Sequence, residues 1–391
     1  MVTEVKNHLV SSIIPFWKSL RDDEFGGYYG YLDHDLNFDK KAEKGCILNS
    51  RILWFFSSAY VLLKDESLLD EAKHAYDFMI NNCFDKVNGG IFWSMTYDGR
   101  VKDSTKHTYN QAFAIYALSA YFEASGDKNA LNRAEELFHI IEEKCKDEKG
   151  YLEASDESFH KISNDKLSEN GVMADRTMNT LLHVLEAYTE LYRASGNVQV
   201  KEALEEILDL FANKVYNKEL HRQEVFFDDD YNSLLDLHSY GHDIETSWLV
   251  DRAVEAIDAK DESVAKKITP ITSELAKNIY ENAFDGHSLP VECENGVVNE
   301  NRVWWVQAET VVGFLNAYNK SGNTDEKYLK AAEACLEYIF EYLVDKRKGS
   351  EWFWAVDKDG VPLKELPIVE PWKCPYHNGR MCLEIIKRME R

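Results

Sequence analysis

Two kinds of segment with helical periodicity alternate along the chain. In one kind, charged and apolar residues share the helix, as in 128–145, where Ala134, Leu137 and Phe138 fall on one face. In the other kind almost every side is apolar, as in 46–63. A helix that is apolar all round is stable only when neighbours bury it on every side. The pattern therefore predicts two layers, in which outer helices facing solvent enclose inner helices.

The segments recur with a regular period. The dipeptide Ala-Tyr stands near the end of four inner segments, at intervals of about 65 residues or twice that. In three copies a glycine follows within a few residues, where a helix C-terminus favours a left-handed residue. The copies are Ala59-Tyr60, Ala120-Tyr121, Ala187-Tyr188 and Ala317-Tyr318, and the glycines are Gly126, Gly196 and Gly322.

Helix pairs of this length fit six times into the chain, and six pairs in a ring define an (α/α)6 barrel. We predict this all-α barrel as a single catalytic domain over 1–391, with an open solenoid as the structural alternative. Glycine-rich stretches such as Gly26-Gly27 and Gly89-Gly90 predict short hairpin loops at one mouth. The outer helices are predicted at 4–20, 67–84, 128–145, 198–215, 262–282 and 326–344, and the inner ones at 46–63, 109–125, 176–194, 242–257, 305–321 and 377–390.

The amino-acid composition limits which binding partners this protein is expected to have. The chain has 69 acidic and 45 basic residues, a formal charge of -24, which disfavours binding to nucleic-acid phosphates. Its seven cysteines are scattered without a CxxC pair, so neither a disulfide framework nor a zinc knuckle is predicted. The N-terminus lacks the pattern of a signal peptide, and no apolar run approaches membrane-spanning length. We expect a cytoplasmic monomer without a membrane partner.

Polar residues interrupt the inner helices at one level, near their N-terminal turns. His242 and Glu245 stand at i and i+3, so they share a face of the first turn, and His377 stands in the same way with Arg380. Aligned on the Ala-Tyr position, the other inner helices contribute Arg51, Gln111, Asn179, His183 and Glu309. Polar groups in apolar helices are costly unless they line a wet cavity, so their shared level predicts one pocket at the barrel mouth.

Each of these residues also has a purely structural interpretation. A single histidine such as His183 is often a hydrogen-bonded core residue, and Arg51 could form an ion pair with Glu309 or Glu245. A metal site would need more ligands than His242 and Glu245, so no metal is predicted. The delivery of polar residues by all six inner helices favours the pocket.

Aromatic residues accompany the polar ones. Sugar rings have apolar C–H faces that stack on aromatic rings, while polar groups bind their edges. Trp54 and Trp248 are predicted as core residues. The candidates for contact with a sugar are Tyr109, Trp304, Trp305 and Trp372.

The motifs in the sequence, and those missing from it, limit the reactions that the protein could catalyse. Two imidazoles suit proton transfer near neutral pH. The sequence has no phosphate-binding loop, dinucleotide fingerprint or Gly-x-Ser-x-Gly motif, so no cofactor is predicted. Proton abstraction beside a carbonyl, or glycoside hydrolysis by paired carboxylates, remains open.

The sequence resembles the cellobiose 2-epimerases of the N-acylglucosamine 2-epimerase superfamily nearly from end to end. The motifs that carry the resemblance are Phe25 to Gly30, Asn49 to Trp54, Ser168 to Gly171, Met178 to Thr180, Gly241 to Glu245, Trp304-Trp305 and Cys374 to Arg380. The resemblance implies an (α/α)6 barrel, no cofactor, and reversible epimerisation at C2 of the reducing-end glucose of β-1,4-linked disaccharides such as cellobiose and lactose.

The resemblance also implies roles for individual residues. It makes His242 and His377 the acid/base pair. It places Arg51, Asn179, His183, Glu245 and Glu309 around the reducing sugar, and Tyr109, Trp304, Trp305 and Trp372 against the sugar rings.

Other functions of three kinds stay open at this point. Within the superfamily, the chain could be an N-acylglucosamine 2-epimerase or a mannose isomerase. From another class, an (α/α)6 glycoside hydrolase would use Glu245 and Glu309 as its carboxylate pair. A non-catalytic sugar-binding barrel is the third.

Overall fold

The inner helices are buried on all sides, as their composition predicts. Every residue from Thr108 to Tyr121 of helix α5 is buried, and so are most residues of the five other inner helices. The computed structural model describes residues 1–167, 170–257 and 262–389. Ser168 and Glu169 of one resemblance motif, and residue 390 of the last predicted helix, lie outside the described residues. The inner helices are α3 (Cys46–Leu63), α5 (Thr108–Ser125), α7 (Met178–Ser195), α9 (Tyr240–Ala256), α11 (Trp304–Lys320) and α13 (His377–Met389).

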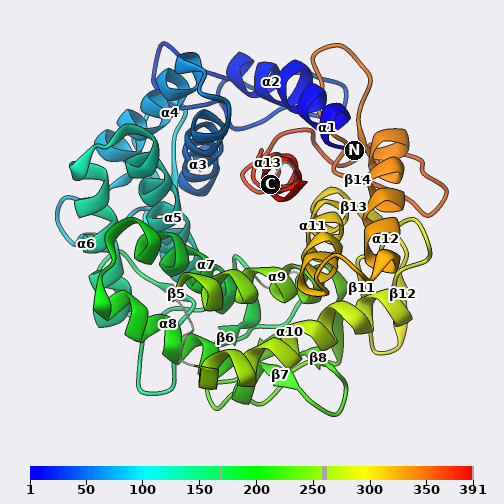
Figure 1. The fold of residues 1–391 in the computed structure, drawn as a ribbon. Helices are drawn as coiled ribbons and strands as arrows, with labels where there is room; N and C mark the ends of the chain where they lie inside the picture. The colour runs from blue at the N-terminus through cyan, green and yellow to red at the C-terminus, as the bar shows by residue number, and fades with distance from the viewer. Residues whose placement is uncertain (168–169, 258–261, 390–391) are drawn as a thin grey trace.

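An outer layer surrounds this inner ring (Figure 1). Its helices keep apolar faces toward the ring and charged faces toward solvent, and several end in a π-helical turn. They are α1 (Val2–His8), η1 (Leu9–Ile13), α2 (Ile14–Ser19), α4 (Glu66–Phe78), η2 (Met79–Cys83), α6 (Lys128–Lys144), α8 (Val198–Leu210), η3 (Phe211–Val215), α10 (Glu262–Asn282), α12 (Glu326–Tyr338) and η4 (Ile339–Leu343). The predicted (α/α)6 barrel is confirmed.

Short antiparallel strands connect the helices. Most of them lie just before an inner helix or pair with a strand that does, so they gather at one end of the ring. The pairings are β1–β2–β3, β4–β5, β6–β9, β7–β8, β10–β11–β12 and β13–β14. The strands are β1 (Lys44–Gly45), β2 (Ser94–Met95), β3 (Val101–Asp103), β4 (Lys106–His107), β5 (Ala154–Ser155), β6 (Arg176–Thr177), β7 (Tyr216–Asn217), β8 (Arg222–Gln223), β9 (Phe226–Phe227), β10 (Leu237–Ser239), β11 (Glu292–Glu294), β12 (Val297–Asn299), β13 (Arg302–Val303) and β14 (Ala355–Val356).

An ion pair with a buried basic side chain recurs where an outer helix ends and its loop begins. A basic residue just before the inner helix binds an acidic residue that follows the outer helix of the same pair. Lys44 lies 2.5 Å from Asp22, and Lys106 lies 2.9 Å from Asp85. Arg176 with Asp147 (2.6 Å), Arg302 with Asp285 (2.8 Å) and Lys373 with Glu351 (2.6 Å) repeat the arrangement. These pairs fix the loops on which the mouth is built.

Some of the polar residues near the N-terminal turns of the inner helices hold the loops in place. The Gln111 side chain accepts from the backbone N–H of Ile91 and donates to the carbonyl of the same residue, at 2.7 and 2.8 Å. Gln307 binds the backbone of Leu289 in the same way. These amides hold loops against the inner helices, so Gln111 marks the level of the mouth without belonging to the site.

Helix α3 corrects one expectation. Cys46–Leu63 is long and apolar enough to cross a membrane by length and composition alone, although no such run was expected. Of that stretch, 72% is buried inside the protein. A helix enclosed on all sides must be as apolar as a membrane span, which explains the composition.

Glu351 closes the ring between the first and last helices. Its carboxylate accepts from the Trp17 indole at 3.0 Å and from Lys373 at 2.6 Å, and the Asn378 amide binds it as well. Trp17 belongs to the first outer helix, whereas Lys373 and Asn378 flank the start of α13. Lys373 and Glu351 are both 0% exposed. The two ends of the chain therefore meet at one buried carboxylate.

We predict that Glu351→Ala lowers the free energy of unfolding by about 3–5 kcal/mol, because it leaves the Lys373 ammonium buried without its partner. Denaturant unfolding measures the change. The matched control is Glu326→Ala, which removes an ion pair to Lys330 whose side chains are 71% and 73% exposed. That control should change stability by less than about 1 kcal/mol. Similar losses for both variants would contradict this account of ring closure.

Candidate active site

A guanidinium at the centre of the ring organises the polar side chains. Arg380, on α13, is 0% exposed and binds three carboxylates from three other inner helices. One Nη group binds Glu186 of α7, and the other binds both Glu245 of α9 and Glu309 of α11, the last at 2.7 Å. A buried guanidinium is stable only with such partners, so the pairing fixes the relative position of four helices.

His377 is held by one of these carboxylates. Its Nδ1 lies 2.8 Å from Oε1 of Glu309, whose other oxygen accepts from the Trp248 indole at 3.0 Å. Burial raises the pKa of Glu309, while Arg380 and Trp248 oppose that rise. Burial, followed by the charge of Arg380, lowers the pKa of His377 well below its ordinary 6.5. His377 is therefore a neutral imidazole at neutral pH, and Glu309 fixes its orientation.

His242 lies near His377 but has a different partner. Its Nδ1 is 2.7 Å from Oγ of Ser239. Burial lowers the pKa of His242 to about 3, with a smaller contribution from His183. The indole of Trp305 contacts both histidines, with ring centroids 4.7 Å from His242 and 5.5 Å from His377. The two histidines predicted to work together therefore meet at one aromatic ring.

Gly241 makes this contact possible. A Cβ atom at that position would lie 2.6 Å from the Trp305 ring, closer than real Cβ contacts permit. The glycine beside His242 therefore lets the indole pack directly against the first turn of α9.

His183 and Arg51 line the same region. Nδ1 of His183 lies 3.0 Å from Glu186, and burial lowers the pKa of His183 to about 4. Arg51 donates to the Tyr109 hydroxyl at 2.8 Å, and its guanidinium lies 4.1 Å from the centroid of the Phe113 ring. The ion pair considered for Arg51 with Glu245 or Glu309 is not formed among the described residues, because Arg380 holds those carboxylates.

Several buried polar atoms in this region have no hydrogen-bond partner within the part of the chain that the structure describes. They include Nε of Arg51, Oδ1 of Asn179, Oε2 of Glu245 and Nε of Arg380. Unsatisfied buried polar atoms are rare in native proteins, and four in one cluster indicate a place for a polar ligand. Burial and then Glu309 raise the pKa of Glu245 well above its ordinary value. Its Oε1 binds Arg380, whereas its Oε2 has no partner and faces this cluster of unsatisfied atoms.

The positions of the tryptophans agree only partly with the roles predicted for them. Trp54 and Trp248 are core residues as predicted, with exposures of 5% and 0%. Trp304 is only 2% exposed and packs edge-on against His377, so it supports that ring from behind. Trp305 and Trp372 are half-buried, and Trp372 lies 5.8 Å from Tyr109 between ring centroids.

Sequence reasoning missed the residues that connect this cluster. Glu186 received no role, although it binds His183 and Arg380 and accepts from the Tyr376 hydroxyl. Arg380 was noted without a function. The available signal was spacing, because Glu186 follows His183 by three residues, as Arg380 follows His377.

The cluster does not form an open metal site. Ligand atoms of Glu245, Glu309 and His377 lie within 4.8 Å of one another. One Nη group of Arg380, however, binds Oε1 of both glutamates. The guanidinium thus already supplies the positive charge that a metal ion would bring.

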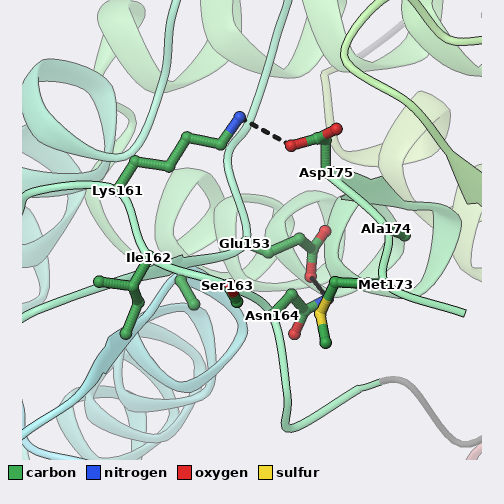
Figure 2. A pocket seen from close by; sticks show the side chains of 9 residues that line it. Glu153, Lys161, Ile162, Ser163, Asn164, Met173, Ala174 and Asp175 are labelled. Carbon is green, nitrogen blue, oxygen red and sulfur yellow. Dashed lines mark hydrogen bonds and ion pairs between the residues drawn. The ribbon is translucent and has the colours of Figure 1, made fainter. Parts of the chain in front are cut away.

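A separate cavity of about 320 Å³ lies among the loops (Figure 2). Lys161 and Asp175 form an ion pair at 2.8 Å on its wall, and Glu153 reaches it from below. Glu153 accepts from the backbone N–H of Thr177 and from the Thr180 hydroxyl, both at 2.7 Å. Burial nevertheless raises the pKa of Glu153 to about 7. None of the predicted site residues lines this cavity, so it is distinct from the histidine cluster.

Comparison with known proteins identifies the family. The model of the N-acylglucosamine 2-epimerase (GlcNAc 2-epimerase) family matches residues 27–378. The chain therefore belongs to the N-acylglucosamine 2-epimerase family, and it is a carbohydrate epimerase.

Individual relatives have names that are more specific than the family description. Cellobiose 2-epimerase of Eubacterium cellulosolvens is 53% identical over 399 residues, covering 98% of this chain and 97% of the relative. Cellobiose 2-epimerase of Ruminococcus albus is 50% identical over 388 residues, covering 99% of both.

Solved structures agree with these relatives. A sugar epimerase from a ruminal bacterium superposes with a TM-score of 0.97 at 50% identity, covering 99% of each chain. A D-mannose isomerase (TM-score 0.83, 19% identity, covering 99% and 98%) and a GH76 α-mannanase (0.66, 13%, covering 99% and 97%) share the fold alone.

We predict that stability depends on pH through Glu153. Its raised pKa means that its contribution is complete below the ordinary value of 4.5 and is lost as pH rises through about 7. A rise of this size corresponds to about 3 kcal/mol. Glu153→Gln cannot ionise, so its melting temperature should fall less than that of the wild type between pH 5 and pH 8. Calorimetry at several pH values measures this. Glu157→Gln, on the exposed part of the same loop, is the control, and parallel profiles for all three proteins would refute the prediction.

Proposed function

We propose that this epimerase inverts C2 of the reducing-end glucose of β-1,4-linked disaccharides, converting cellobiose to glucosyl-mannose and lactose to epilactose. The full-length similarity to proteins named cellobiose 2-epimerase supports the substrate class. The single observation that carries the reaction type is the pair of imidazoles, the half-buried His242 and the buried His377, on one indole. Inversion of a carbon by proton transfer needs two such groups, one for each face.

The reaction uses the acidity of C2–H beside the C1 carbonyl of the open-chain sugar. One imidazole accepts this proton at Nε2, and the electron pair of the C–H bond forms an enediolate. The other histidine, as an imidazolium, gives its Nε2 proton to the opposite face of C2. Arg51 supplies a fixed positive charge for the enediolate oxygen. One proton leaves and one arrives, and exchange with water restores the starting state.

The electrostatics of the site suit the abstraction step. Lowered pKa values favour the neutral form of both imidazoles, and only a neutral imidazole can accept the C2 proton. The histidine that delivers a proton must first take that proton from water. When His377 accepts the C2 proton, Glu309 stabilises the imidazolium through the Nδ1 hydrogen bond. The unsatisfied atoms of Asn179 and Glu245 offer hydrogen bonds to sugar hydroxyls.

The geometry argues against a glycoside hydrolase. Such enzymes place two carboxyl groups on opposite sides of the scissile bond, about 5 Å or more apart. Here Glu245 and Glu309 are joined through one nitrogen of Arg380, so no sugar can lie between those oxygens. A mannose-type isomerase shares the fold, and only the reaction products separate it from the epimerase.

The proposed function is tested by incubating the protein with cellobiose in heavy water and analysing the products. We expect deuterium at C2 of a disaccharide that ends in mannose. A keto-disaccharide as the main product would indicate an isomerase, and free glucose would indicate a hydrolase. Either outcome would overturn the proposal.

We predict that His242→Asn and His377→Asn each lower epimerisation about 10²–10⁴-fold, the usual contribution of a general acid or base. The fold should survive, because the barrel is stabilised by its apolar helix faces. Steady-state rates and melting temperatures measure the two effects. His160→Asn is the matched control, since that side chain is 80% exposed on a loop. Retention of more than about a tenth of the activity in both site variants would exclude a two-histidine mechanism.

A further inference from the structure

Ser239 occupies a helix-capping position without capping the helix. It precedes α9, where a serine hydroxyl ordinarily accepts from a backbone N–H of the first turn. In this structure Ser239 makes no such bond. Its hydroxyl instead lies 2.7 Å from Nδ1 of His242, and the residue is only 6% exposed. By contrast, Thr177 caps α7 in the ordinary way, accepting from the N–H of Thr180 at 3.0 Å.

The backbone of Ser239 is fixed independently of the helix. It is the last residue of β10 and is paired with Glu292 of β11. The hydroxyl is therefore presented to His242 by a sheet rather than by the turn that carries the imidazole. Such an arrangement holds the ring from outside its own helix.

The two histidines thus have Nδ1 partners of different chemistry. A carboxylate such as Glu309 carries a negative charge and stabilises the imidazolium form of His377. A serine hydroxyl is neutral, and by rotating it can either donate a hydrogen bond or accept one. It can donate to a bare Nδ1 of neutral His242 and accept from Nδ1–H of the protonated ring. His242 thereby keeps its orientation in both protonation states, without the stabilisation that a carboxylate gives to the cation.

We infer that Ser239 is a positioning residue that keeps His242 directed at C2 and leaves its imidazolium a strong acid. This inference rests on the proposed function. The pair is then unequal: His377, backed by Glu309, is the better proton acceptor, and His242, backed by Ser239, is the better donor. In the favoured sequence, the C2 proton moves to Nε2 of His377, and Nε2–H of protonated His242 forms the new C–H bond. Water then removes the proton from His377 and reprotonates His242.

The test compares Ser239→Ala with Ser239→Thr, which keeps the hydroxyl. Ser239→Ala should lower kcat about 10- to 100-fold, as misplacement of a reacting group does, with little change in KM. Its melting temperature should stay close to that of the wild type, because no capping bond is lost. Ser239→Thr should recover most of the rate.

Hydrogen exchange at C2 in heavy water provides a second measurement. It would not change if Ser239 only stabilised the fold. With a poorly held His242, the enediolate formed by His377 returns more often to the starting sugar. Ser239→Ala should therefore raise the ratio of deuterium in recovered substrate to product formed. The rise should occur with only one of the two epimers, the one whose C2 proton faces His377. With the other epimer, exchange and turnover should fall together.

The outcomes separate the two proposals. If the wild type does not epimerise, the proposed function fails, whatever the variants do. If the wild type epimerises but Ser239→Ala keeps its rate within about twofold, or loses rate and melting temperature together, the role of Ser239 is refuted. An unchanged exchange ratio with both epimers would also refute it.

Discussion

The burial of one guanidinium is the constraint on which the centre of this protein depends. Arg380 has no contact with solvent, and a buried positive charge is tolerated only when carboxylates surround it. Its three partners come from α7, α9 and α11, so those helices must converge on α13. His183 and His377 bind two of the same carboxylates through Nδ1. The positions of these imidazoles are therefore consequences of how one charge is neutralised.

The ring around this centre is held by a second set of ion pairs, in which the basic side chain is buried. Basic residues before the inner helices pair with acidic residues after the outer ones, as Lys106 does with Asp85. Glu351 completes the series and joins the first outer helix to the last inner helix. Such pairs add little stability over an apolar core, but breaking one is costly. They fix the loops at one end of the ring. Helices α9 and α11 begin at that end, with His242 and Trp305 in their first turns.

Polar residues at the mouth have two functions that sequence position does not separate. Gln111 and Gln307 use both ends of their side-chain amides to bind loop backbones. Asn179 and Glu245 stand at a similar level but leave atoms without partners. The difference is the state of their hydrogen bonds. A satisfied buried group contributes to structure, whereas an unsatisfied one indicates a ligand.

The sequence by itself determined the helices, their two layers and the level of the polar residues, because periodicity and turn residues act over a few neighbouring positions. It also singled out His242, His377 and Glu309. Only the tertiary structure decided which groups bind one another. Arg51 lacks a carboxylate because Arg380 holds both candidates, and Ser239 turns from its helix to His242. These contacts join helices far apart in the chain, and they depend on how each helix is rotated once the ring has closed, which no local pattern encodes.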